Sequence, residues 1–426
     1  MCNYIKIYVV SLTFFLGGIF FCVVPEMSKW LVFIPVLVVL AFAFLFQRDF
    51  FSLQPYLLLV VPYLALNFGF LWSVGADISK LAILVCLGML VFSFSYFFVR
   101  RCVDSGFFIF SVNQPYCMRV LIFVSSALLL LKFWLNSGVV GPLAVAFNLV
   151  VRPSLEFLMA GAVFALLSTA GVGLALVLIS IVVGYLALFA LLSNDVSRMS
   201  FFQYFLMVGI VIFYRLRGFK CFKIDLLTLL LLILCSIFLS VMVVLAGITS
   251  GGDSFLYLNA LQAIEEVDRQ GKFHPLMPLH NGFAILIPDF FWLSEKPKGY
   301  TTNGWFLQHV LNLDPSEHPW GVGITSFGAG YLYGGYWGVI VLFFFYGITA
   351  ALFRGVARNP FMLGVLVIFN IKLLFCIFRM DESMLMGAIL PSFLFLFLIY
   401  RMVRFRVIRI EGYSSVPLEG RYAGKT

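Results

Sequence analysis

The chain has 426 residues, of which 63% are hydrophobic and only 11% are charged, and its mean hydropathy is +1.07. This composition excludes a soluble globular class and is typical of a polytopic helical membrane protein. A transmembrane β-barrel is also excluded, because its strands alternate apolar and polar residues, whereas this sequence has unbroken apolar runs near the ~20 residues that a spanning helix needs.

The first apolar run has the charge and the apolar core of a signal peptide. No small-residue cleavage site follows it, so we expect it to be retained as a first helix. In chain order the apolar runs predict an all-α protein with about twelve transmembrane helices, at 5–24, 30–46, 55–73, 81–99, 118–136, 154–170, 171–192, 199–214, 225–249, 328–353, 360–378 and 384–402. Only a short Ser-Thr-Ala-Gly-Val-Gly connection at 168–173 separates the sixth and seventh of these predicted helices.

Basic residues gather on one side of these predicted helices. With a cytoplasmic N-terminus, 17 of the 28 Lys and Arg residues fall in cytoplasmic segments, whereas the short outside loops carry only scattered single cations. The positive-inside rule therefore predicts that both termini are cytoplasmic. Because this topology explains the net charge of +9, we expect membrane lipid as a partner and no nucleic acid.

The loops divide the chain into four parts. Residues 1–249 are predicted to hold nine transmembrane helices with short loops, 250–326 one large periplasmic loop, 327–402 three more transmembrane helices, and 403–426 a cytoplasmic tail. A loop as long as the second part is uncommon unless it is functional. Its stretch 255–269 has apolar residues at helical spacing, which predicts an amphipathic helix that lies on the membrane surface or caps a cavity.

The large loop concentrates the residues that can carry chemistry. It contains 8 of the 19 acidic residues and all four histidines. No two of these histidines have the HxH or HxxxH spacing that seats two metal ligands on one element, so no metal is expected. No P-loop, Rossmann fingerprint or serine-hydrolase elbow occurs in a suitable context either, so no cofactor is expected. None of the eight cysteines lies in this loop, which argues against a disulfide framework.

Cations in or beside the membrane are a second group of candidates, because they are costly to retain without a counter-ion and often mark a ligand site. They are Arg152, Arg198 and Arg379 in short outside loops, and Lys372 within a predicted helix. A guanidinium suits a diphosphate better than an ammonium does, because its planar fork binds two oxygens at once. Structural alternatives stay open: a snorkelling Lys372, a pair of Arg198 with Asp195, and a pair of Arg379 with Asp381 or Glu382.

Three stretches carry a family resemblance. Ile287-Pro288, Trp292 and Lys296-Pro297 form an "IP…W…KP" pattern, Ser326 begins the run SFGAGYLYGGYWG, and Arg379 begins Arg-Met-Asp-Glu-Ser. Together they resemble the Wzy-type O-antigen and oligosaccharide repeat-unit polymerases over about residues 274–390. The sequence departs from that family in having Gly335-Tyr336 where Phe-Gly is commoner, and Asp289 where a basic residue often follows Ile-Pro.

The resemblance implies a glycosyltransferase of the bacterial inner membrane that uses a polyprenyl-diphosphate-linked donor. Such an enzyme transfers a growing glycan from one undecaprenyl diphosphate carrier to the sugar end of another. It needs no nucleotide, because its donor is already activated. The resemblance also implies a Wzz-type chain-length regulator as a partner.

The same resemblance gives roles to residues of this chain. The candidates for binding the substrate diphosphate are Arg152, Arg379, Arg198 and Lys296. The candidates for the catalytic base are His280, His309, Glu295 and Asp289. Of these, His280 is preferred because it lies in the turn-rich stretch Pro-Leu-His-Asn-Gly and histidine titrates near neutral pH. The alternative, a histidine that is hydrogen-bonded within the loop, stays open.

Two other functions fit the predicted architecture. An O-antigen ligase shares the helix count and the donor, and only the "IP…W…KP" and Ser326–Gly338 patterns favour a polymerase over it. A lipid-linked oligosaccharide flippase or other transporter would instead have ionisable residues along its helices and no long polar loop. Here only Lys132, Glu156 and Lys372 lie further inside the predicted helices, whereas Lys6, Arg119, Asp225 and Arg401 lie at or next to an end.

Overall fold

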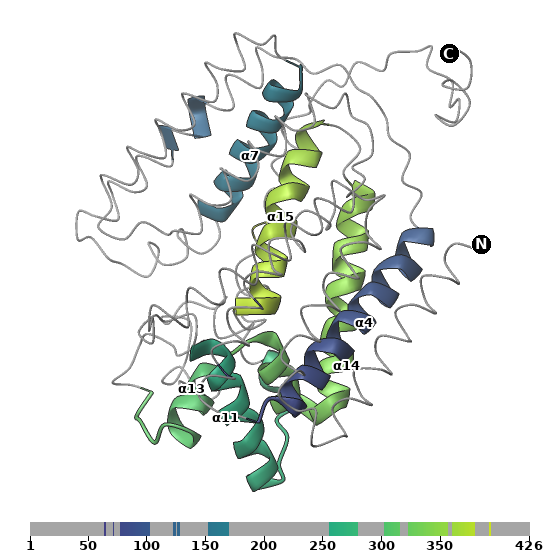
Figure 1. Cartoon of the computed structure of the whole chain (residues 1–426). Helices are drawn as coiled ribbons and strands as arrows, with labels where there is room; N and C mark the ends of the chain where they lie inside the picture. Colours follow the sequence, from purple (N-terminus) through teal and green to yellow (C-terminus); the bar gives the residue numbers. More distant parts are fainter. Residues whose placement is uncertain are drawn as a thin grey trace, which may run out of the picture.

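The computed structural model describes residues 77–102, 152–169, 255–279, 302–315, 323–356 and 360–379, with the isolated positions 64, 71, 122–124, 126–127 and 392. All secondary structure in these residues is helical. The helices are α4 (Ser79–Cys102), α7 (Arg152–Thr169), α11 (Phe255–Gln270), α13 (Thr302–His309), α14 (Ser326–Val356) and α15 (Pro360–Arg379) (Figure 1).

Three of these helices, α4, α14 and α15, are long and apolar enough to cross a membrane. The helix α7 carries a shorter apolar stretch, Ser154–Leu166. The chain is therefore a multi-pass membrane protein, and the helices predicted at 81–99, 154–170 and 360–378 are confirmed as helices within three residues at each end.

Residues at the N-termini of α4 and α15 explain where these helices begin. The Asp77 carboxylate accepts the Ser79 N–H at 3.0 Å and caps α4, and α15 starts at Pro360, whose missing N–H costs nothing at a first helical position.

The helix α14 is not the continuous span predicted at 328–353. Its backbone leaves the helical conformation at Gly334 and Gly335, and Gly335 has φ 62° and ψ −140°, a conformation open essentially to glycine alone. A Cβ on Gly338 would lie 2.1 Å from the Gly330 carbonyl oxygen, so the two halves of α14 fold back against each other. The long half begins at Tyr336 and at about 1.5 Å per residue is about 30 Å long, close to the thickness of a bilayer core.

The membrane helices pack as two pairs. In the first pair, α4 and the long half of α14 run in the same direction, because Gly88 meets Phe343 and Ser95, further along α4, meets Gly347. Glycine at these contacts lets the two backbones approach closely.

In the second pair, α7 and α15 run in opposite directions. Gly364, near the start of α15, meets Ala160 and Phe164, whereas Lys372 lies beside Glu156, earlier in α7. The directions in both pairs are those that the predicted order of spans requires.

A layer that we call the cap, made by α11 and α13, lies at one end of these helices, at the bottom of Figure 1. The helix α11 confirms the one predicted at 255–269, and its apolar residues Tyr257, Ile264 and Val267 are buried. Its Ala260 packs against Gly328 of α14, and Asn259 Nδ2 donates to the Gly323 carbonyl at 3.1 Å. The apolar face of α11 therefore packs on α14 and does not lie on the membrane surface.

Candidate functional site

The antiparallel pair α7 and α15 brings two predicted diphosphate-binding residues to one end of the molecule. The helix α7 begins at Arg152, and α15 ends at Arg379. Because Lys372 lies beside Glu156, about one turn from the start of α7 and two turns from the end of α15, both arginine positions fall at the same end of the pair. The last turn of α15 contacts the start of α14, on which the cap packs, so this end faces the cap.

The start of α14 is buried between these helices. Ser326 Oγ donates to the Cys376 carbonyl of α15 at 3.1 Å and shares a hydrogen bond with the Tyr346 hydroxyl at 2.9 Å. The Phe327 ring stacks on Phe343 with centroids 4.8 Å apart and also contacts Phe378. These contacts fix the beginning of the run SFGAGYLYGGYWG beside the end of α15, where Arg379 follows Phe378.

An ion pair joins α7 to α15 within the apolar part of both helices. Lys372 Nζ donates to Glu156 Oε2 at 2.8 Å, and the two side chains are only 15% and 10% exposed. The ammonium also lies 5.7 Å from the centre of the Phe157 ring. Lys372 therefore pairs with a carboxylate across the helix interface, which corrects the alternative of a snorkelling lysine.

A polar network ties the cap to the ends of α4 and α14. Lys80 Nζ forms an ion pair with Asp268 Oδ2 and lies 4.6 Å from the centre of the Tyr331 ring. The Tyr331 hydroxyl donates to Asp268 Oδ1 at 2.7 Å. Burial alone would raise the pKa of Asp268, but the hydrogen bonds from Lys80 and Tyr331 outweigh it and hold that pKa below its ordinary value. The Asp268 carboxylate is thus kept ionised at the junction of α4, α11 and α14.

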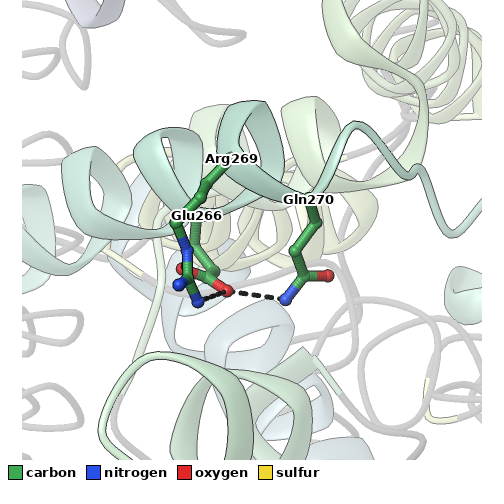
Figure 2. Close-up of polar contacts among 3 residues, drawn as sticks. All are labelled: Glu266, Arg269 and Gln270. Carbon is green, nitrogen blue, oxygen red and sulfur yellow. Dashed lines mark hydrogen bonds and ion pairs between the residues drawn. The ribbon is translucent and has the colours of Figure 1, made fainter.

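Glu266 of α11 accepts hydrogen bonds from two side chains of the same helix. Figure 2 shows Arg269 and Gln270 reaching it from the next turn of the helix. Arg269 donates to both Glu266 oxygens, at 2.8 and 2.7 Å, and Gln270 Nε2 donates at 2.6 Å. The hydrogen bond from Arg269 is the largest cause that lowers the pKa of Glu266, and the nearby charge of His309 lowers it further. The cap therefore places an ionised carboxylate near a predicted catalytic base.

Two histidines lie next to the buried Trp305 in the cap. The exposed His309 ends α13, and its ring centroid is 5.4 Å from that of Trp305. The His274 ring lies 5.9 Å from the same indole, and its Nε2 is buried without a partner among the described residues. Burial lowers the pKa of His274, and the positive charges of Lys272 and His309 add to this effect.

The remaining predicted site residues lie outside the described residues: His280, Asp289, Glu295, Arg198 and Lys296. Of those inside, Arg152 and Arg379 are brought to one end of a helix pair, and His309 lies in the cap.

The sequence analysis did not single out Glu266 and Asp268 as candidate site residues. Glu266 had a visible signal, because Arg269 and Gln270 follow it at the i+3 and i+4 positions of a predicted helix. Asp268 had none, because its partners Lys80 and Tyr331 are far away in the sequence.

The arrangement of possible metal ligands can be checked only for part of the chain. Within the helices and turns that the structure describes, no group of three or more His, Cys, Asp or Glu side chains is placed to hold a metal ion. The described helix α7 begins and α15 ends at an arginine position, and arginine is the side chain best suited to bind a diphosphate. Compared with known proteins, the chain matches no family model, no curated protein and no solved structure.

Proposed function

We propose that this protein is a glycosyltransferase that polymerises undecaprenyl-diphosphate-linked oligosaccharide repeat units into O-antigen or a related surface polysaccharide. In this proposal it acts at the periplasmic face of the bacterial inner membrane, by glycosyl transfer that needs no metal. The cap belongs to the periplasmic loop, and a Wzz-type chain-length regulator is a partner. The resemblance of residues 274–390 to the Wzy-type polymerases is the starting point.

The observation that carries the proposal is the position of Arg152 and Arg379 at the same end of an antiparallel helix pair. These two cations come from helices that are more than 200 residues apart in the sequence, and both ends face the cap. A lipid-linked diphosphate lies at the membrane surface with its sugars outside. Two arginines beneath a polar cap therefore suit a ligand whose charge lies at that surface.

The proposed reaction follows from the chemistry of the donor. The bond between the donor sugar and its diphosphate breaks, and a hydroxyl of the acceptor sugar forms the new glycosidic bond. Arginine at positions 152 and 379 would bind the diphosphate and stabilise the negative charge that develops as it leaves. Arg198 and Lys296 remain further candidates for this role.

The acceptor hydroxyl must lose its proton during the transfer. Among the described residues His309 is the predicted base with a defined position, exposed at the end of α13 and close to the ionised Glu266. An exposed imidazole can act as a general base, because its unprotonated ring nitrogen is open to the acceptor hydroxyl. His280, Glu295 and Asp289 stay candidates for the same step.

Deletion of the gene separates the proposed function from its rivals. A polymerase mutant loses the polysaccharide ladder on a gel but keeps a band of lipid A core carrying one repeat unit. Loss of all capped core points to an O-antigen ligase or to a flippase and contradicts the proposal. An unchanged ladder contradicts all three functions.

Substitution of the two arginines tests the site within that function. Arg152→Ala and Arg379→Ala are each expected to lower the polymerisation rate of the purified protein by about 100-fold, the scale for removing one group that stabilises a developing negative charge. Arg100→Ala is the matched control, because this cation lies at the opposite end of α4 from Lys80 and the cap. Full ladders in both arginine variants at wild-type protein levels would contradict the diphosphate assignment.

A further inference from the structure

An exposed apolar surface lies on the segment that follows α11. Leu276 is 63% exposed, and Phe273 and Leu279 are about half exposed, whereas Met277 between them is buried. The apolar face of α11 itself is buried against α14, so the exposed apolar side chains belong to the segment Gly271–Leu279 and not to the amphipathic helix before it.

The segment Gly271–Leu279 is fastened to the turn of α14. The His274 N–H donates to the Leu332 carbonyl at 3.0 Å, and the Met277 N–H donates to the His274 carbonyl at 3.1 Å. The Phe273 ring packs edge-on against Tyr331, with centroids 6.3 Å apart. These contacts hold Phe273, Leu276 and Leu279 in a defined surface.

This surface is continuous with the exposed face of a membrane-spanning helix. A Cβ on Gly335 would lie 3.2 Å from the tip of the Phe273 ring, and the next residues, Tyr336 and Trp337, begin the long half of α14. Trp337 is 75% exposed, and the exposed apolar stripe continues down the helix through Val341 and Phe345. A helix of this length and hydropathy places Val341 and Phe345 among the lipid chains and Trp337 at their boundary with water.

Cations flank the apolar side chains. Lys272 is exposed in the same segment, and the side chain of Arg269, one turn earlier, is mostly exposed although its guanidinium is paired with Glu266. Basic and aromatic side chains beside exposed leucines are the composition that the headgroup layer of a bilayer binds, with the cations at the phosphates and the apolar groups below them.

We infer that Gly271–Leu279 is a membrane anchor of the cap, in which Phe273, Leu276 and Leu279 insert into the boundary between lipid headgroups and acyl chains. Lys272 contacts the lipid phosphates. The partner of this surface is the bilayer leaflet that surrounds the cap end of α4 and α14. The anchor would fix the depth of the cap relative to the membrane, whatever reaction the protein performs.

Spin labels at single cysteines test the anchor in the full chain, in a background whose native cysteines are replaced. The protein is reconstituted in vesicles of phosphatidylethanolamine and phosphatidylglycerol. A label at Leu276→Cys or Leu279→Cys is expected to collide several-fold more often with oxygen, which enters lipid, than with a water-soluble nickel chelate. Val341→Cys is the lipid-facing reference, and Gln308→Cys, exposed on α13, is the water-facing reference.

Two results would overturn the anchor. One is nickel access at both 276 and 279 as high as at 308, which would place the surface in water. The other is shielding of both labels from oxygen and nickel alike, which would show that a protein partner or a second copy covers the surface. Leu276→Cys and Leu279→Cys change exposed side chains, so the fold is expected to tolerate both.

Discussion

His274 lies in the segment that follows α11, and its protonation state affects the packing beside α13. Its Nε2 is buried without a partner among the described residues, and its ring lies beside Trp305 of α13. A proton on this nitrogen would create a buried cation without a hydrogen-bond acceptor, which is why burial lowers its pKa. Burial therefore favours the neutral form of His274 in the folded protein.

This preference predicts that the docking of α13 depends on pH. A histidine whose pKa is lower in the folded state stabilises the fold fully above its unfolded pKa of about 6.5, and that stability is lost as pH falls through the folded pKa. Hydrogen exchange of residues 302–315, corrected for intrinsic rates, should show weaker protection at about pH 5.5 than at about pH 7.5.

Two variants assign this pH dependence to its residue. His274→Gln should show equal protection at both pH values, whereas His309→Gln, which changes an exposed side chain, should keep the wild-type difference. If the difference survives in His274→Gln and disappears in His309→Gln, the role belongs to His309 and the prediction is wrong.

Two glycines at the turn of α14 differ in whether there is room for a Cβ atom. A Cβ at Gly338 would lie 2.1 Å from the Gly330 carbonyl oxygen, whereas a Cβ at Gly334 would meet nothing within 4 Å. Gly338→Ala should therefore destabilise the protein by roughly 1–3 kcal/mol, the scale for overpacking a tight contact. Gly334→Ala, at φ −173°, should be close to neutral.

Thermal unfolding of the two purified variants in the same detergent checks this contrast. The midpoint of Gly338→Ala is expected to fall by a few degrees, and that of Gly334→Ala to stay near the wild-type value. Equal losses in both variants would mean that the turn does not need the close approach of its two halves.

The ion pair between α7 and α15 should be sensitive to removal of either charge alone. Glu156→Gln or Lys372→Met removes the ion pair and keeps the other charge in a largely buried position, which costs roughly 3–5 kcal/mol. The reversed pair, Glu156→Lys with Lys372→Glu, should recover most of that loss. The apolar pair Glu156→Leu with Lys372→Met should be near neutral, because both charges are then gone.

Unfolding midpoints of these four variants in one detergent provide the measurement. A reversed pair that is no more stable than the single variants would show that the two charges do not interact in the folded protein. Single variants as stable as the wild type would show that the remaining charge is solvated, which contradicts burial of the ion pair.

At the level of elements, the sequence predicted the helices that periodicity and hydropathy define. The amphipathic pattern at 255–269 became α11, and the apolar runs at 81–99 and 360–378 became α4 and α15. The fold-back of α14 was not predicted, because a glycine-rich apolar run has the same composition whether it is straight or turned. Only the conformation of Gly335 and the contact of Gly338 with Gly330 decide between the two.

For the whole molecule, the sequence could name candidates for the site but could not bring them together. The sequence identified Arg152 and Arg379 as cations in short outside loops. That both positions lie at the same end of one helix pair follows from the opposite directions of α7 and α15. The contacts of Asp268 with Lys80 and Tyr331 join three helices that no local pattern connects. Contacts of this kind depend on packing between distant segments, which a single sequence does not reveal.

The orientation of the whole molecule in the membrane can be tested from the two ends of α4. Lys80, at the start of this helix, pairs with Asp268 of the cap, whereas Arg100 lies about 30 Å further along the helix axis. The charge distribution predicts that the cap faces the periplasm. In a background with the native cysteines replaced, Lys272→Cys should react with a membrane-impermeant maleimide in intact spheroplasts, and Arg100→Cys should react only after the membrane is opened. Because α4 separates these positions by the thickness of a bilayer, the reverse pattern would invert the topology and move the cap, with both arginine positions, to the cytoplasmic side.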